Sequence, residues 1–310
     1  MTELDKPSNT LQLYKMTPTL TKKQIQKLDS VHNAIKAMWS PSREDMKVKI
    51  KDEFGQIDFT IDDIDLHFSM FPDVNAMKGK TQLPEIHSKS NLRDMKKGQT
   101  LLSCDVMHIG KQAYLVAAMN SPEENNRISN VFAEAIASEA AKDVTAATIR
   151  VGNHVKQVLG YTMKIEFDNN KGVKVSKDTV EETLQCDLEM VSNHVDYAEA
   201  AIKFIKQRVR TKNSSLVYDL CSTVLLHIVI GAVLIINRVS RKANGKRSAY
   251  KVLNPTKKTN FKAFYSFSPT DLVEVKTHTS SSTLSLRTTT ATPLHPSIDD
   301  NEDWDFYSLE

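Results

Sequence analysis

The sequence predicts an α+β fold, with a β-rich core, added amphipathic helices and a disordered C-terminal tail. Three observations predict it. Apolar residues recur every three or four positions in some segments and every two positions in others, as in helices and strands respectively. The 310 residues are 40% hydrophobic, which is enough for a buried core. The last part of the chain is rich in Ser and Thr.

These patterns divide the chain into three parts. Residues 1–20 are predicted to be a flexible N-terminal arm, because they carry no regular apolar pattern. Residues 21–275 form the predicted core, which includes an apolar segment at 216–237 and a basic segment at 238–262. Residues 276–310 form the predicted disordered tail, which is Ser/Thr-rich and then acidic.

The core begins with a predicted amphipathic helix over 22–39. Thr21 and Gln24 match a capping box. The positions after them carry one apolar stripe, made of Ile25, Leu28, Val31, Ile35 and Met38. The apolar period then changes to two, which predicts half-buried strands over 48–50, 57–61 and 64–70. A polar loop is expected over 72–98.

A β-hairpin is predicted next. Its strands are 101–109 and 112–119, and Gly110-Lys111 forms the turn. The Ala-rich residues 128–159 then favour a helix that ends at Gly160.

A further strand pair and a long helix complete this region. Strands are expected over 161–167 and 173–175. Asp178 and Glu181 match a second capping box, and apolar residues spaced by three or four predict a helix over 179–210.

The segment 220–237 carries no formal charge and has two interpretations. A transmembrane helix needs about 20 apolar residues, and this segment is just short of that. Two adjacent buried strands, with a bend at Gly231, give the same continuous apolar run. We favour buried strands with membrane contact. In either case the residues that enter the membrane or the core are Leu220, Val224, Leu225, Leu226, Ile228, Val229, Ile230, Val233, Leu234, Ile235 and Ile236.

The segment 238–262 contains nine basic residues and no acidic residue. Such a run predicts contact with phosphates of nucleic acid or of anionic lipid. Aromatic residues near it, such as Tyr250 and Phe261, would stack on single-stranded bases. The alternative is a solvated basic loop. The predicted nucleic-acid-binding residues are Arg238, Arg241, Lys242, Lys246, Arg247, Lys251, Lys257, Lys258 and Lys262.

The Ser/Thr tract of the tail contains candidate phosphorylation sites. Phosphates there would compete with a polyanion for the basic segment. The simpler interpretation is a mobile tail without a switch. The candidate acceptors are Ser280, Ser281, Ser282 and Ser285.

No catalytic or metal-binding motif occurs in the sequence. There is no Gly-rich phosphate loop and no Gly-x-Ser-x-Gly elbow. The cysteines Cys104, Cys186 and Cys221 are far apart, and no ligands are grouped at zinc spacing. Asp62, Asp63 and Asp65 look like paired catalytic carboxylates, but the predicted strand alternation places them on an exposed face. We therefore expect a protein that is not an enzyme and needs no cofactor or metal.

The order of elements over 100–240 carries a family resemblance. Two apolar strands around a turn are LLSCDVMHI, GK and QAYLVAAMN. A strand, a helix and a strongly apolar region follow as YTMKIEF, the helix after Asp178, and TVLLHIVIGAVLIIN. This order resembles the thirty-kilodalton superfamily of plant viral movement proteins, and the charged, Ser/Thr-rich tail fits that family too.

The resemblance implies a viral cell-to-cell movement protein. Such proteins bind single-stranded nucleic acid, associate with the host endoplasmic reticulum membrane and act at plasmodesmata. We expect these partners here, together with a homo-oligomer. Two alternatives stay open. One is a single-pass membrane protein anchored by 216–237 with a basic cytoplasmic flank, and the other is a viral matrix or structural protein.

Overall fold

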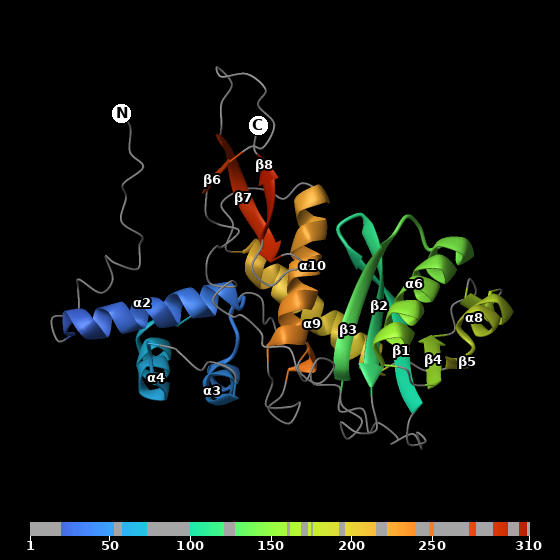
Figure 1. Cartoon of the computed structure of the whole chain (residues 1–310), viewed down its shortest axis with the longest axis horizontal. Helices are drawn as coiled ribbons and strands as arrows, with labels where there is room; N and C mark the ends of the chain where they lie inside the picture. Colours follow the sequence, from blue (N-terminus) through green and yellow to red (C-terminus); the bar gives the residue numbers. More distant parts are fainter. Residues whose placement is uncertain are drawn as a thin grey trace.

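The structure is a computed structural model of the chain, and it consists of helices around a mixed β-sheet (Figure 1). The predicted α+β class is confirmed. The segments that the structure describes are 20–52, 58–72, 99–120, 128–159, 162–168, 173–174, 176–191, 196–214, 222–239, 248–250, 273–276, 288–296 and 304–308. The predicted arm at 1–20 and loop at 72–98 lie almost wholly outside the described residues.

Three helices lie in the described N-terminal segments. They are α2 (Lys22–Ala37), α3 (Arg43–Asp52) and α4 (Ile61–Met70), and they lie on the side of α9 and α10 that faces away from the sheet (Figure 1). The predicted first helix and its capping box between Thr21 and Gln24 are confirmed. The apolar stripe of α2 is buried at Leu28, Val31, Ile35 and Met38.

The strands predicted over 48–50, 57–61 and 64–70 were wrong. The first lies inside α3, and the third lies inside α4. Of the second, Ile57 lies outside the described residues, residues 58–60 are not a strand, and Ile61 begins α4. Ile61, Ile64 and Phe68 are spaced by three and four, so the helical period was present as well. A capping box between Thr60 and Asp63 starts α4, and this local signal decides in favour of the helix.

The central sheet has five strands in the order β3-β2-β1-β4-β5. The predicted hairpin is confirmed as β1 (Gln99–Ile109) and β2 (Gln112–Asn120), with Ile109 opposite Gln112 across the turn. Strand β3 (Ile128–Ile136) continues the antiparallel pairing on β2. On the other side of β1, β4 (Thr162–Asp168) and β5 (Asp187–Val191) pair in parallel.

The helix predicted over 128–159 was wrong in its first third. Residues Ile128–Ile136 form β3, and the helix α6 covers only Ala141–Leu159. The Ala-rich composition hid the strand, because alanine fits a crowded position in a sheet when its neighbours are large. In β3, Ala133 pairs with Val116 and Ala135 pairs with Tyr114.

The helix predicted over 179–210 is divided by a strand. It consists of α8 (Lys177–Leu184), β5 and α9 (Asp196–Asn213). Gln185 ends α8 in the left-handed conformation, with φ of 51°. The predicted capping box does not form, because α8 begins at Lys177 with Ser176 as its N-cap, so Asp178 lies inside the helix. Glu181 Oε1 instead accepts a hydrogen bond of 2.9 Å from the backbone N–H of Leu188 in β5. Val173 and Lys174 are helical, so the strand expected there was also wrong.

The uncharged segment forms a helix, α10 (Ser222–Arg238), so our preference for buried strands was wrong. Its buried residues include Val224, Ile228, Gly231, Ala232 and Ile235, which are spaced by three and four. Their sequence is rich in β-branched residues, but packing against other elements overrides that local preference. Among the described residues, no helix meets the length and apolar character needed to cross a membrane.

Helices cover both faces of the central sheet (Figure 1). One face packs against α9 and α10 in an apolar cluster that includes Met107, Tyr114 and Val116 of the sheet. The α2–α4 helices contribute to the same cluster. The opposite face packs against α6 and α8 through residues such as Cys104 and Phe167.

A second sheet lies near the C-terminus. It contains β6 (Val273–Lys276), β7 (Thr288–Pro296) and β8 (Trp304–Ser308), all antiparallel. The segment 276–310 was expected to be disordered throughout, and these strands correct that expectation. Helix α10 contacts β7, so this sheet packs beside the core. High Ser and Thr content is compatible with strands, because threonine has a high β-propensity.

Candidate functional site at the junction of β1 and β4

The order of the strands places a topological switch point between β1 and β4. From β1 the chain adds β2 and β3 on one side, and it then crosses over to add β4 and β5 on the other. Since β1 and β4 are parallel, their carboxyl ends point in the same direction. In open sheets, ligands bind outside the carboxyl ends of strands at such a point.

Two carboxylates lie at this junction. The last registered pair between β1 and β4 is Cys104 with Phe167, and the next residue on each strand is an aspartate, Asp105 and Asp168. Cys104 and Phe167 both face the α6 and α8 helices. Because side chains alternate along a strand, Asp105 and Asp168 both face the other side of the sheet, each one residue past the last registered pair. Both are half-buried, and Oδ1 of Asp105 accepts a hydrogen bond of 2.7 Å from the N–H of Val106.

Two more polar residues precede the aspartates on the same face. Ser103 and Glu166 are opposite each other in the register, and their exposed fractions are 0% and 2%. Among the described residues, no hydrogen-bond partner reaches the hydroxyl of Ser103. The acidic residues of this region affect the pKa of the Cys104 thiol. Burial raises the pKa of its thiol well above the ordinary value, and the charges of Glu166 and Asp105 raise it further.

Helix α9 packs over β1 and β2 and carries a third carboxylate, Glu199, in its first turn. The residues that follow Glu199 at intervals of four, three and four are Lys203, Lys206 and Arg210. This spacing places all four on one side of the helix. Lys203 and Arg210 are exposed, and Lys206 is half-buried. We call Lys203, Lys206 and Arg210 the basic stripe of α9.

Carboxylate oxygens are the ligands that Mg²⁺ and Mn²⁺ prefer in proteins. Asp105 and Asp168 therefore fit a divalent cation by their chemistry, and Glu199 is a further carboxylate on α9. In the described segments, no group of three Asp, Glu, His or Cys side chains is close enough together to hold a metal ion. The junction thus offers two carboxylates, and a third protein ligand would have to move closer to bind the same cation.

The predicted basic segment is described only at its start and near Tyr250. Arg238 is buried, with 4% exposed, and its guanidinium lies 5.1 Å from the ring centre of Tyr250. Burial lowers its pKa. A phosphate would therefore reach Arg238 only after repacking. The other eight basic residues of that prediction, and the serines at 280–285, lie outside the described residues. Leu220 of the apolar segment does as well.

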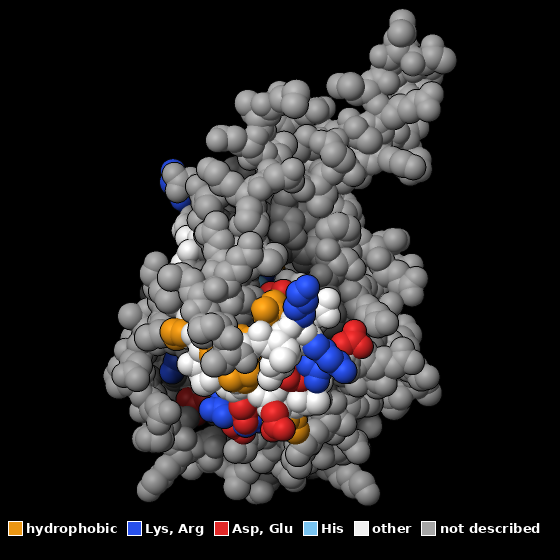
Figure 2. All heavy atoms as spheres, turned by 90° about the vertical axis from the view of Figure 1, so that its left-hand side faces the viewer, with side chains coloured by type: hydrophobic (Ala, Val, Ile, Leu, Met, Phe, Trp, Pro, Cys, Tyr) orange, Lys and Arg blue, Asp and Glu red, His pale blue; other side chains and the backbone are white. Residues whose placement is uncertain are grey.

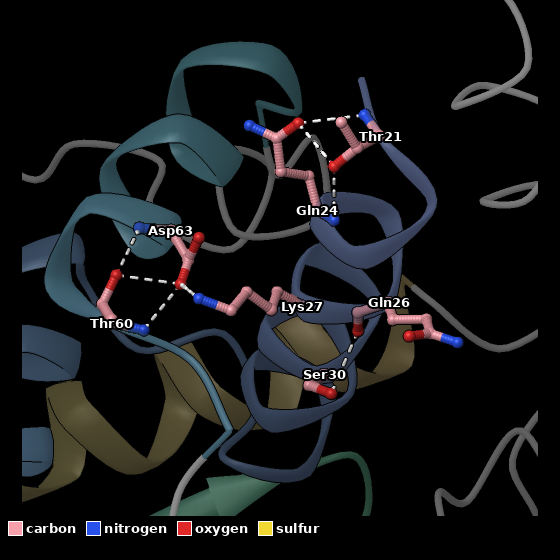
Figure 3. A network of polar contacts seen from close by, with 7 residues as sticks. All are labelled: Thr21, Gln24, Gln26, Lys27, Ser30, Thr60 and Asp63. Carbon is pink, nitrogen blue, oxygen red and sulfur yellow. Dashed lines mark hydrogen bonds and ion pairs between the residues drawn. The ribbon is translucent and has the colours of Figure 1, made fainter.

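The aspartates of α4 form ion pairs rather than a catalytic pair. Asp63 accepts hydrogen bonds from Thr60 and from Lys27 Nζ, at 3.3 Å, as Figure 3 shows. Burial acts to raise the pKa of Asp63, but these bonds hold it below its usual value. Hydrogen bonds from Arg43 and Lys47 lower the pKa of Asp65 to about 2. These contacts join α2, α3 and α4.

The outer face of α2–α4 mixes basic and acidic side chains (Figure 2). It has no large single-sign patch among the described residues, so it does not resemble a polyanion-binding surface.

Sequence reasoning missed Asp105, Asp168 and Glu199 as a set. Each carries a local signal: Asp105 follows a buried apolar strand segment, Asp168 ends a strand, and Glu199 lies in the first turn of a helix. What was missing was the pairing of β1 with β4, because two further strands and a helix separate these elements along the chain.

Comparisons with known proteins give no identification. No family model matches the chain, and no curated protein matches it.

Proposed function

We propose that this protein binds nucleic acid and acts on its phosphodiester backbone with divalent cations held at the junction of β1 and β4. The observation that carries the proposal is that Asp105 and Asp168 each follow the last registered pair of the parallel strands β1 and β4, at a topological switch point.

The reaction class follows from the ligands and the neighbouring charges. A divalent cation held by carboxylates polarises a phosphoryl oxygen and activates an attacking hydroxyl. Asp105 and Asp168 would hold it, and Glu199 would complete its ligands from α9. In the reaction, a new P–O bond forms to water or to a 3′-hydroxyl, and the P–O bond to the leaving 3′- or 5′-oxygen breaks. The leaving oxygen takes up a proton.

The basic stripe of α9 supports a polyanionic substrate. Lys203, Lys206 and Arg210 follow Glu199 along one side of the helix, and the stripe from Lys203 to Arg210 is about 10 Å long at 1.5 Å per residue. Phosphates along a nucleic-acid strand are a few ångströms apart, so a stripe of this length matches several of them. A small phosphorylated metabolite would need only one basic side chain of this kind.

The predicted movement function rests on the family resemblance alone and stays a prediction. It shares with this proposal the expectation that nucleic acid is the partner. The two differ in chemistry, because a movement protein binds without turnover, whereas the carboxylate site would cleave or join strands.

The test uses the purified full chain with labelled single-stranded and duplex DNA and RNA, in Mg²⁺ or Mn²⁺. We expect cation-dependent cleavage or strand transfer that Asp105→Asn and Asp168→Asn each reduce at least 100-fold. Asp187→Asn is the matched control, because Asp187 lies on β5, on the same face of the sheet as Asp168, and is exposed. Binding without any turnover, unchanged in Asp105→Asn, would contradict the enzymatic proposal and favour a binding protein.

A further inference from the structure

Three side chains that carry oxygen atoms form a buried row across β2, β1 and β4. Ser103 of β1 is opposite Glu166 of β4 in the register. Asn120 of β2 is opposite Leu101, two residues before Ser103, so Asn120 is the diagonal neighbour of Ser103 on the same face of the sheet. The exposed fractions of Asn120, Ser103 and Glu166 are 0%, 0% and 2%. The row therefore lies beneath the surface of the protein.

Two members of the row have polar atoms without a hydrogen-bond partner among the described residues. These atoms are Oγ of Ser103 and both Oδ1 and Nδ2 of Asn120. Buried polar groups are nearly always paired in native proteins, because an unpaired one loses its contacts with water and gains nothing in return. Three such atoms on neighbouring strands indicate a small bound group that completes their contacts.

We propose that Asn120, Ser103 and Glu166 bind a monovalent metal cation, Na⁺ or K⁺. The ligands would be Oδ1 of Asn120, Oγ of Ser103 and the carboxylate of Glu166, and hard cations prefer oxygen ligands of this kind. Water molecules would complete the coordination shell, and one of them would accept a hydrogen bond from Nδ2 of Asn120. The proposal does not depend on the function proposed above.

The charge of the ligand set selects a monovalent cation. Asn120 and Ser103 are neutral, and Glu166 is the one ionisable member of the row. A cation of charge +1 leaves the set without net charge, whereas a divalent cation leaves a buried positive charge, which is costly in a place of low dielectric constant. Glu166 also has another contact, but a carboxylate has about four lone-pair sites and can bind a cation as well.

The experiment is thermal unfolding of the full chain in the chlorides of Na⁺, K⁺ and choline, at constant ionic strength. Choline has no bare metal centre and is too large for a closed site. We expect a saturable rise in melting temperature of about 2–4 °C in Na⁺ or K⁺ relative to choline, because a ligand of the folded state stabilises it. The ion that gives the larger rise identifies the preferred cation.

Two variants remove neutral ligands one at a time. Asn120→Leu and Ser103→Ala should each lose the ion-specific rise. In choline, Asn120→Leu should melt at the wild-type temperature or above it, since it removes buried polar atoms that have no partner. Asn153→Leu is the matched control, because Asn153 is exposed on α6, and it should keep the wild-type response to ions.

A third variant reverses the preference for charge. Asn120→Asp gives the ligand set a formal charge of −2, so it should respond more to Ca²⁺ than to Na⁺ or K⁺. Asp168→Asn should keep the wild-type response to monovalent ions, which separates this site from the carboxylates at the junction of β1 and β4.

Two results would overturn the proposal. One is a melting temperature that is equal in Na⁺, K⁺ and choline, or an ion-specific rise that Asn120→Leu and Ser103→Ala both retain. The other is a larger rise of the wild-type protein in Ca²⁺ that Asn120→Leu abolishes, because the row would then hold a divalent cation.

Discussion

The side chain of Asn237 forms both backbone hydrogen bonds that a further strand would form with Val131. Its Oδ1 accepts from the N–H of Val131 at 2.8 Å, and its Nδ2 donates to the carbonyl of Val131 at 2.7 Å. Val131 belongs to β3, the edge strand, and Asn237 lies in the last turn of α10. One amide therefore fixes α10 to the sheet and closes part of an edge that would otherwise be open to another strand.

Replacing Asn237 with Ala should destabilise the protein by about 1–2 kcal/mol, because the carbonyl of Val131 loses its donor and the N–H of Val131 keeps only Oδ1 of Asn130, at 3.1 Å. The measurement is urea unfolding followed by circular dichroism. Asn153→Ala is the control, since Asn153 is exposed on α6 and should change stability by less than about 0.5 kcal/mol. If both variants unfold at the same urea concentration, the Asn237 hydrogen bonds make no net contribution to the free energy of unfolding.

Gly152 allows α6 to approach α8. A Cβ at this position would lie 2.5 Å from Cδ1 of Leu184, which is buried at 1% exposed. Gly152→Ala gains about 1 kcal/mol of helix propensity but overpacks the contact by about 1–3 kcal/mol, so we expect a net loss of about 1 kcal/mol. In a Leu184→Ala background the same change should become stabilising. Unfolding of the four proteins of this cycle checks the reversal of sign.

Local patterns predicted elements well where one signal dominated. The hairpin over 101–119 follows from alternation around Gly110, whose φ of 60° suits the first turn position. The helix over 22–39 follows from its capping box and stripe. Where two periods coexisted, as at 61–70, alternation was given too much weight. The capping box between Thr60 and Asp63 predicts the helix correctly.

Tertiary contacts decided the remaining elements. The segment 222–238 is a helix although its β-branched residues favour strands, because its apolar side packs against α9 and β3. The candidate site was beyond local patterns for the same reason. Asp105 and Asp168 come to the same junction only through the parallel pairing of β1 with β4, and a single sequence carries no direct signal for that pairing.

Tyr114 predicts a loss of stability at alkaline pH. It is 1% exposed, and no described residue lies in hydrogen-bond reach of its hydroxyl. Burial raises the pKa of Tyr114 to about 12. An unfolded tyrosine ionises near pH 10, so its contribution to stability is complete below about pH 10 and is lost as the pH rises toward 12.

Tyr114→Phe should therefore flatten the fall in unfolding free energy between pH 10 and 12. At pH 7 it should be neutral or stabilising by about 1 kcal/mol, because a buried hydroxyl without a partner is costly. Urea unfolding at pH 7, 10 and 11 tests both points. A variant that is strongly destabilised at pH 7 would show that the hydroxyl has a partner.

The basic stripe of α9 and the basic segment at 238–262 make separable predictions for nucleic-acid binding. The slope of log affinity against log salt concentration becomes shallower by about 1 for every phosphate that a variant no longer neutralises. Replacing Lys203, Lys206 and Arg210 with Gln should therefore reduce the slope by about 2–3 if the strand follows α9. The comparison variant replaces Arg241, Lys242, Lys246 and Arg247 with Ala.

The measurement is fluorescence anisotropy with a labelled single strand from 50 to 300 mM salt. If both variants reduce the slope, phosphates bind at both elements. If only the variant of Arg241, Lys242, Lys246 and Arg247 reduces the slope, the nucleic acid binds at the basic segment and not near Glu199 or the carboxylate site. That result would favour the movement function. A reduction confined to the α9 variant places the strand beside Glu199, which is the position that the proposed chemistry at Asp105 and Asp168 requires.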